Sequence, residues 1–222
     1  MSTNVLVLET STESGSIAIV RDDVLVAELL FASRDSATGA RTEALGPAVT
    51  RCLDLASISA RDLTAVVCGA GPGGFTSLRS AAALAKGICT AWATPLYAVS
   101  SLELLAWSAG LAEGSFIVAL PAGRNESFAL DVTCEPDHIA VTSVPYLIRD
   151  DELRTRALHA RSVLVGPRLD IDAIPRAAST VSHLNEIRDR GSADLDAWEP
   201  SYGRLAEAQV KWETAHGRPL SA

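Results

Sequence analysis

The sequence predicts a two-lobed α/β protein. Its 222 residues are more than one small domain needs. Apolar residues make up 48% of the chain, and they come in short blocks that suit buried strands and helix faces. A strand-rich segment followed by helical periodicity occurs in the first part of the chain and again, more weakly, in the second. We therefore expect an N-terminal lobe over residues 1–100 and a smaller C-terminal lobe over residues 101–222.

In the N-terminal part, three consecutive strands are predicted by the runs NVLVLET, SGSIAIVRDD and VLVAELLF, and their close spacing favours an antiparallel meander. A helix is predicted from Arg41 to Ala56, where apolar residues recur at spacings of three and four. Pro47 marks either the start of that helix or a kink in it. A buried strand in LTAVVCGA, a helix from about Thr76 to Trp92 and a strand in PLYAVS complete the lobe.

In the C-terminal part, three strands are predicted in GSFIVALP, ESFALDVT and HIAVTSVPYLI. A helix in DDELRTRALHA, a strand in RSVLVGP and a helix in VSHLNEIRDRG follow. The last predicted helix, RLAEAQVKWETAHG, either belongs to this lobe or packs back on the first one. Tandem βββαβ(α) units of this kind are typical of the actin-like ATPase (ASKHA) superfold, whose lobes are duplicated ribonuclease-H-like folds.

Charge and composition exclude some classes of function. The formal net charge is −8 and no run of Lys or Arg stands out, so direct binding to nucleic acid phosphates is not expected. No segment has the pattern of a secretory signal or a membrane span, and we expect a cytoplasmic protein. The four cysteines lack metal-binding spacing, which predicts buried, reduced thiols.

Two loops are candidates for phosphate binding. One follows the first strand in LETSTESGS, where a carboxylate and several hydroxyls come together; a solvated hairpin is the alternative. The other is GAGPGGFTSLR, whose glycines leave backbone N–H groups uncovered ahead of a helix. That loop matches neither the Walker nor the dinucleotide pattern, so a structural corner is the alternative. The candidate residues are Glu9, Thr10, Ser11, Thr12, Gly71 and Gly73.

The two helices of the N-terminal part carry more small and apolar residues than one buried face requires. Small side chains allow another helix to approach closely. The second helix is apolar on more than one face and must therefore bury more than one, against either another helix of the chain or a partner protein. The candidate interface residues are Leu45, Val49, Cys52, Leu53, Leu78, Ala81, Ala82, Ala85 and Cys89.

Four stretches resemble the TsaB (YeaZ) family, namely VLVLETSTESGSIAIV, CGAGPGGFTSLRSAAALAKGI, PLYAVSSLELLA and EPSYGRLAEAQ. This family is the short paralogue of the tRNA threonylcarbamoyladenosine transferase TsaD, and both carry the M22 or glycoprotease-like label. The chain departs from the family pattern at several positions. Glu9 and Pro121 stand where the family has Asp, Gly74 where Ser is common, Ser77 where Gly is common and Phe128 where the family has Tyr.

The resemblance also implies what the chain lacks. TsaD-like proteins bind a metal through two histidines in a V-N-H-x-x-x-H segment, and the corresponding positions here hold Ser101 and Leu105. We therefore expect no catalytic residue, no metal and no required cofactor, with weak ATP or ADP binding left open at Thr10–Thr12 or at the partner interface.

The implied function is that of a scaffold. The resemblance implies that the two helices pack against a second copy or against TsaD in a four-helix bundle. The chain would stabilise TsaD, together with the ATPase TsaE, during formation of N6-threonylcarbamoyladenosine at tRNA position 37. tRNA would be reached only indirectly, through the complex, and no membrane is involved.

Two other functions remain as alternatives. One is a small ATPase or kinase of the actin-like superfold that uses Glu9, Thr10 and Gly71. The other is a metallopeptidase, suggested by the M22 label, which needs a metal or an activated nucleophile. ATP turnover or bound zinc would separate these alternatives from a scaffold.

Overall fold

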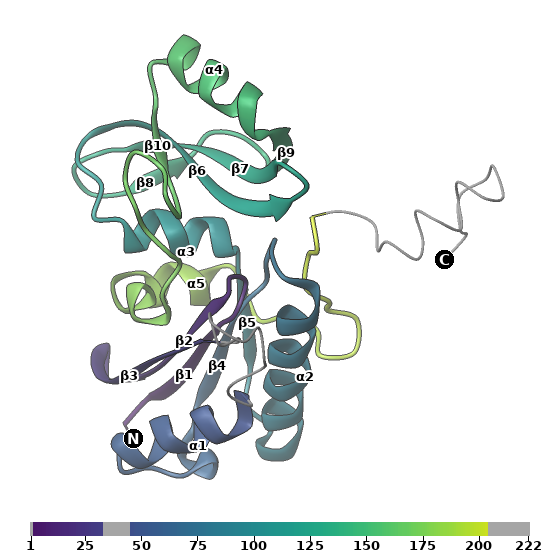
Figure 1. Ribbon diagram of the computed structural model, residues 1–222. Coiled ribbons are helices and arrows are strands. Elements are labelled where there is room, and N and C mark those ends of the chain that lie inside the picture. Colours follow the sequence, from purple (N-terminus) through teal and green to yellow (C-terminus); the bar gives the residue numbers. More distant parts are fainter. Residues whose placement is uncertain (1, 33–44, 204–222) are drawn as a thin grey trace, which may run out of the picture.

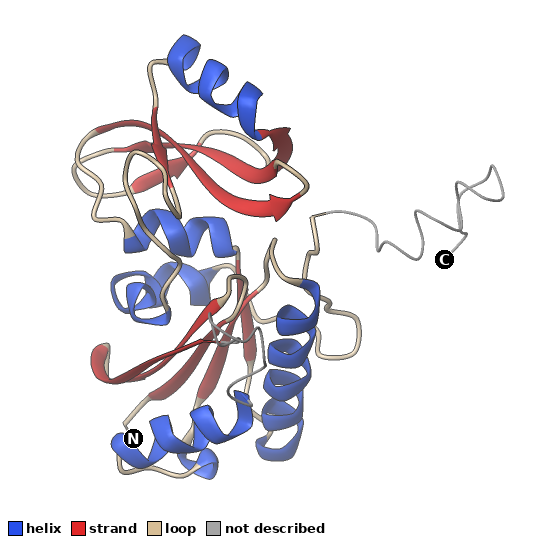
Figure 2. Cartoon of the chain, viewed as in Figure 1, coloured by secondary structure: helices blue, strands red, loops and turns tan. Residues whose placement is uncertain are grey.

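The computed structural model describes residues 2–32 and 45–203, and it contains two β-sheets (Figures 1 and 2). The first sheet has the order β3-β2-β1-β4-β5. β1 (Asn4–Glu9), β2 (Ser14–Arg21) and β3 (Val24–Ala32) form the predicted antiparallel meander. β4 (Ala65–Gly69) and β5 (Leu96–Val99) add to it in parallel. The α/β prediction and the actin-like two-lobe class are confirmed.

Helices cover both faces of the first sheet, because alternate residues of its central strand point in opposite directions. Leu6 and Leu8 pack toward α1 (Leu45–Leu55) and α2 (Phe75–Trp92). Val5 and Val7 pack toward the short helices η2 (Ala177–His183) and α5 (Leu184–Asp189). The helix predicted from Arg41 is described from Leu45 onward, with Pro47 in its first turns, and residues 41–44 lie outside the described part. A short 3-10 helix, η1 (Ala60–Asp62), precedes β4.

The second sheet has the order β10-β6-β7-β8, with β9 also pairing with β7. Its strands are β6 (Gly114–Gly123), β7 (Glu126–Cys134), β8 (Ile139–Val141), β9 (Tyr146–Arg149) and β10 (Val163–Val165), and α4 (Asp150–Ala160) covers one face. The single strand predicted over HIAVTSVPYLI is wrong. β8 and β9 both pair with β7 but are separated at residues 142–145, where Pro145 has no N–H group for a ladder hydrogen bond.

The helix α3 (Ser101–Ser108) belongs to both cores. Leu104 packs with the first sheet, whereas Leu102 and Leu105 pack with the second. Its N-terminus is capped by Ser100, whose Oγ accepts a hydrogen bond from the Leu102 N–H at 3.3 Å. α3 is therefore the layer between the two lobes (Figure 1).

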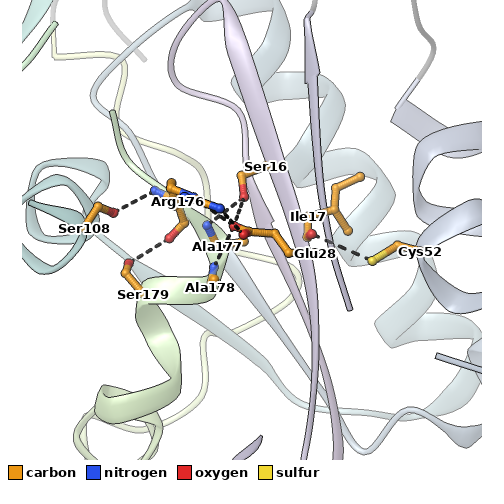
Figure 3. A network of polar contacts seen from close by, with 9 residues as sticks. All are labelled: Ser16, Ile17, Glu28, Cys52, Ser108, Arg176, Ala177, Ala178 and Ser179. Atoms are coloured by element: carbon orange, nitrogen blue, oxygen red, sulfur yellow. Dashed lines mark hydrogen bonds and ion pairs between the residues drawn. The ribbon is translucent and has the colours of Figure 1, made fainter. Parts of the chain in front are cut away.

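After β10 the chain returns to the first sheet through a polar network (Figure 3). Arg176 forms an ion pair with Glu28 of β3, and its Nε donates to Glu28 Oε1 at 3.2 Å. Ser16 Oγ donates to the same carboxylate at 2.9 Å and accepts from the Ala177 N–H at 2.9 Å. The Arg176 N–H donates to Ser108 Oγ of α3 at 2.9 Å. These contacts fix residues 176–179 on the first lobe.

The helix predicted over VSHLNEIRDRG is α-helical only from Leu184 to Asp189, because the residues before Leu184 belong to the 3-10 helix η2. The last predicted helix, RLAEAQVKWETAHG, lies outside the described residues. Among the helices that are described, none combines the length and the apolar content that a bilayer crossing requires.

Candidate functional site

Glu9 lies at the end of β1, fully buried between the two candidate loops. Its Oε1 accepts a hydrogen bond from the Ser11 N–H at 2.5 Å, and its Oε2 accepts one from Ser101 Oγ at 2.8 Å. Ser101 Oγ in turn accepts from the Gly71 N–H at 3.2 Å. Burial raises the pKa of the Glu9 carboxyl, and the hydrogen bonds from Ser11 and Ser101 oppose that rise.

Most of the polar groups in the candidate phosphate loops are engaged with the chain itself. Thr10 Oγ1 donates to the Ser77 carbonyl at 3.0 Å, and Thr12 Oγ1 donates to the Ser14 carbonyl at 2.7 Å. Ser11 Oγ is buried without a hydrogen-bond partner. Gly73 lies so close to Ser11 that an added Cβ would be 2.5 Å from the Ser11 carbonyl oxygen. The structure thus brings the two loops together, and backbone packing between them occupies the space beside Gly73.

Glu9→Gln is expected to change the pH dependence of stability. The folded-state pKa of Glu9 lies above its ordinary value of 4.5. Its contribution to stability is therefore fully present below the unfolded-state pKa and is lost as pH rises through the folded-state pKa. Because an amide does not titrate, the variant should gain stability relative to the parent as pH rises above 4.5, by about 1.4 kcal/mol for each unit of pKa elevation. Urea unfolding of both proteins at a series of pH values above 4.5 gives the free energy of unfolding of each. Curves of this free energy against pH that stay parallel for the two proteins would contradict the raised pKa.

The positions that hold metal-binding histidines in TsaD-like proteins do not fit a metal here. Ser101 Oγ is committed to Glu9 and Gly71, and Leu105 is fully buried in the core of the second lobe. Within residues 2–32 and 45–203, no group of three or more His, Cys, Asp or Glu side chains is placed to hold an ion. The side chains at this point can neither ligate a divalent cation nor replace the missing imidazoles.

The thiols in the first lobe are unsuited to nucleophilic chemistry. Cys52, Cys68 and Cys89 are free and buried. Burial raises the pKa of Cys52 to about 11 and that of Cys68 still further. Since the thiolate is the reactive form, these groups are inert near neutral pH.

Nearly all the predicted interface residues lie inside the chain's own core. Leu45 is half-buried, and the other residues of that set are buried against the first sheet or within its helical layer. The set comprises Leu45, Val49, Cys52, Leu53, Leu78, Ala81, Ala82, Ala85 and Cys89. They account for the apolar face that the sequence pattern detects, but they do not form the accessible surface of α1 and α2.

The accessible side of α2 carries a stripe of small residues that the candidate interface set does not include. It consists of Thr76, Ser80, Ala83, Gly87 and Thr90, all exposed. Their spacings of four and three place them on one face of the helix. No atom lies within 4 Å of the position that a Cβ would take at Gly87. Because the stripe lies on the face of the helix opposite the buried residues, it could have been found from the sequence as the face that the core-facing positions leave uncovered.

Comparison with known proteins identifies the family. A family model described as TsaD, tRNA N6-adenosine threonylcarbamoyltransferase, matches residues 35–145, which is half of the chain. The Bacillus subtilis tRNA threonylcarbamoyladenosine biosynthesis protein TsaB is 24% identical over 227 residues, covering 94% of this chain and 97% of that protein. The chain belongs to the TsaB (YeaZ) family.

The chain is also similar to a second TsaB sequence and to a solved structure. The Escherichia coli protein TsaB is 29% identical over 126 residues, covering 56% of this chain and 52% of that protein. The solved structure of YeaZ from Pseudomonas aeruginosa has a TM-score of 0.70 at 22% identity and covers 90% of this chain and 99% of that one. At this level of identity the structural match supports the fold.

The structure shows what surrounds two of the residues that depart from the TsaB pattern. At Gly74, where the family commonly has Ser, an added Cβ would have only the Ser77 Oγ, at 2.9 Å, as a close neighbour. Phe128, where the family has Tyr, is buried on β7 and faces the cleft between the lobes. The glycine-rich loop of this chain therefore has room for a side chain at position 74 but not at position 73.

Proposed function

We propose that this TsaB-family chain is a non-catalytic subunit that docks on a TsaD-type threonylcarbamoyltransferase and activates it. The reaction is the formation of N6-threonylcarbamoyladenosine at tRNA position 37, with a TsaE-type ATPase as the further component. The chain itself requires no cofactor, and tRNA is reached through the complex. The proposal is supported by the family assignment and by the surface of α2.

The exposed stripe on α2 is the observation that carries the proposal. Its small side chains allow the backbone of another helix to approach closely over several turns. Docking on this side leaves the buried residues of α2 in place. A second copy of the chain is the alternative occupant.

The loops support a docking role rather than chemistry. Glu9 is enclosed by its own hydrogen-bond partners, and the threonine hydroxyls beside it donate to backbone carbonyls. A small ATPase or kinase would need these groups turned toward a nucleotide. ATP turnover by the isolated chain that is lost in Glu9→Ala would favour that alternative, and stoichiometric zinc would favour a metallopeptidase.

The docking surface is tested by placing a charge on the exposed stripe. Ala83→Glu should lower affinity for the TsaD-type protein of the same genome by about a hundredfold or more, because it inserts a larger, charged side chain where helices must meet. Ala160→Glu on the exposed end of α4 is the matched control. Leu78 and Ala82 are unsuitable positions because both are buried, so a charge there would test folding.

Isothermal titration calorimetry gives the affinities, and thermal unfolding of each variant shows that it remains folded. Equal affinity of Ala83→Glu and Ala160→Glu would overturn the proposed surface. Light scattering on the chain alone reports self-association. A dimer that Ala83→Glu dissociates, with no binding to the TsaD-type protein, would assign the stripe to a second copy instead.

A further inference from the structure

Residues 193–203, here called the C-terminal strap, run beside α2 and along the edge of the first sheet (Figure 1). The strap begins where the Ala193 N–H donates to the Leu96 carbonyl of β5 at 2.7 Å. Trp198 packs on the core of the first lobe, with Lys86 Nζ of α2 5.9 Å from its ring centroid. Near its end, the Ser201 N–H donates to the Ala70 carbonyl at 2.7 Å.

The end of the strap contacts both lobes. The Ser201 carbonyl lies against Gly71, where an added Cβ would overlap it. Gly203 lies against the ring of Phe128 in the second sheet, so closely that a Cβ there would overlap the ring carbons. A cleft of about 250 Å³ opens at this point, and its lining includes Pro72, Phe128, Tyr146, Ser201 and Gly203. The strap thus forms one wall of the space between the lobes.

Tyr202, between these two contacts, reaches the N-terminal end of α2. Its ring centroid is 4.6 Å from that of Phe75, and its hydroxyl accepts a hydrogen bond from Arg79 Nε at 3.3 Å. The Arg79 guanidinium also lies 4.6 Å from the Phe75 ring centroid. Phe75 and Arg79 are exposed and flank the first residues of the small-residue stripe. A protein docked on this end of α2 therefore meets Tyr202 together with the helix.

We infer that the strap is a clamp that couples docking on α2 to closure of the cleft between the lobes, with Tyr202 as its positioning residue. This inference rests on the proposed function, because it takes α2 as the docking surface. A partner that holds Phe75, Arg79 and Tyr202 also holds Gly203 against Phe128. By reciprocity, a change that moves Gly203 away from Phe128 weakens docking.

The first test uses the free chain, so it does not depend on any partner. Tyr202→Ala removes the ring from α2, and hydrogen exchange followed by mass spectrometry reads the far side, at the N–H groups of Ala70, Gly71 and β7. Exchange there should become about fivefold faster, since aromatic and cation–π contacts hold the strap. Tyr202→Phe, which keeps the ring, should restore slow exchange. Unchanged exchange in Tyr202→Ala would overturn the clamp.

The second test substitutes a residue that lines the cleft and measures binding to the TsaD-type protein. Gly203→Ala combines a positive φ of 68° with overlap on Phe128, whereas Gly191→Ala has a similar φ of 86° and no atom within 4 Å. Gly191→Ala is therefore the control for backbone strain. We expect Gly203→Ala to weaken binding to the TsaD-type protein about tenfold relative to this control.

Equal binding by the two glycine variants would overturn the coupling. If the unchanged chain does not bind the TsaD-type protein, the proposed function fails. The hydrogen-exchange experiment on the free chain still tests the link from Tyr202 to the cleft. A failure of the proposed function can therefore be distinguished from a failure of the clamp.

Discussion

Gly73→Ala should destabilise the protein by about 2–4 kcal/mol, because the added methyl group would overlap the backbone of the neighbouring loop. A Cβ at Gly73 would lie 2.5 Å from both the Cβ and the carbonyl oxygen of Ser11, and 2.7 Å from its Cα. Neither loop can yield easily, since the Gly74 N–H donates to the Ser11 carbonyl at 2.8 Å. Urea unfolding followed by circular dichroism measures the change.

Gly74→Ala is the matched control for this substitution. Its nearest neighbour would be the Ser77 hydroxyl, which can rotate away, and its backbone angles of −61° and 114° are ordinary for alanine. Its effect should stay within about 0.5 kcal/mol. Similar losses at both positions would show that the loops are not packed as the structure has them.

Arg176→Ala should cost about 2–3 kcal/mol, because it leaves the Glu28 carboxylate without its ion-pair partner. The Glu28 side chain is only 11% exposed. Its remaining donors are Ser16 Oγ and, at 3.4 Å, the Ala178 N–H. Arg188→Ala is the control, since Arg188 pairs at 3.5 Å with the 54% exposed Asp23. Such surface pairs contribute about 0–1 kcal/mol. Equal effects of the two variants would show that the network in Figure 3 carries no special stability.

Local periodicity predicted most of the first lobe. The alternation in SGSIAIVRDD and the apolar run in NVLVLET gave β2 and β1 within a few residues, because each strand is buried on a sheet that forms from neighbouring segments. The glycine-rich turn correctly placed the start of α2. These features depend on interactions close in sequence, which a pattern can detect.

The remaining features depend on contacts that are distant in sequence. The break between β8 and β9 follows from the pairing of both strands with β7, and Pro145 alone does not reveal where that pairing stops. Helical periodicity identified an apolar face on α2 but not what covers it, so Leu78, Ala81 and Ala85 were assigned to a partner although the chain buries them itself. The environment of Glu9 likewise depends on Ser101, which lies 92 residues further along the chain.

The return of residues 176–203 to the first sheet has a consequence for synthesis of the protein. The face of that sheet formed by Val5, Val7 and Val67 is covered by Ala177, Leu184 and Ile187, which the ribosome adds only after the whole second sheet. Although domains generally fold from the N-terminus during translation, the lobe that begins first must wait, with that face of its sheet only partly covered, until residues 177–187 have been synthesised. The nascent chain would then complete its two lobes in the reverse of the order in which they start.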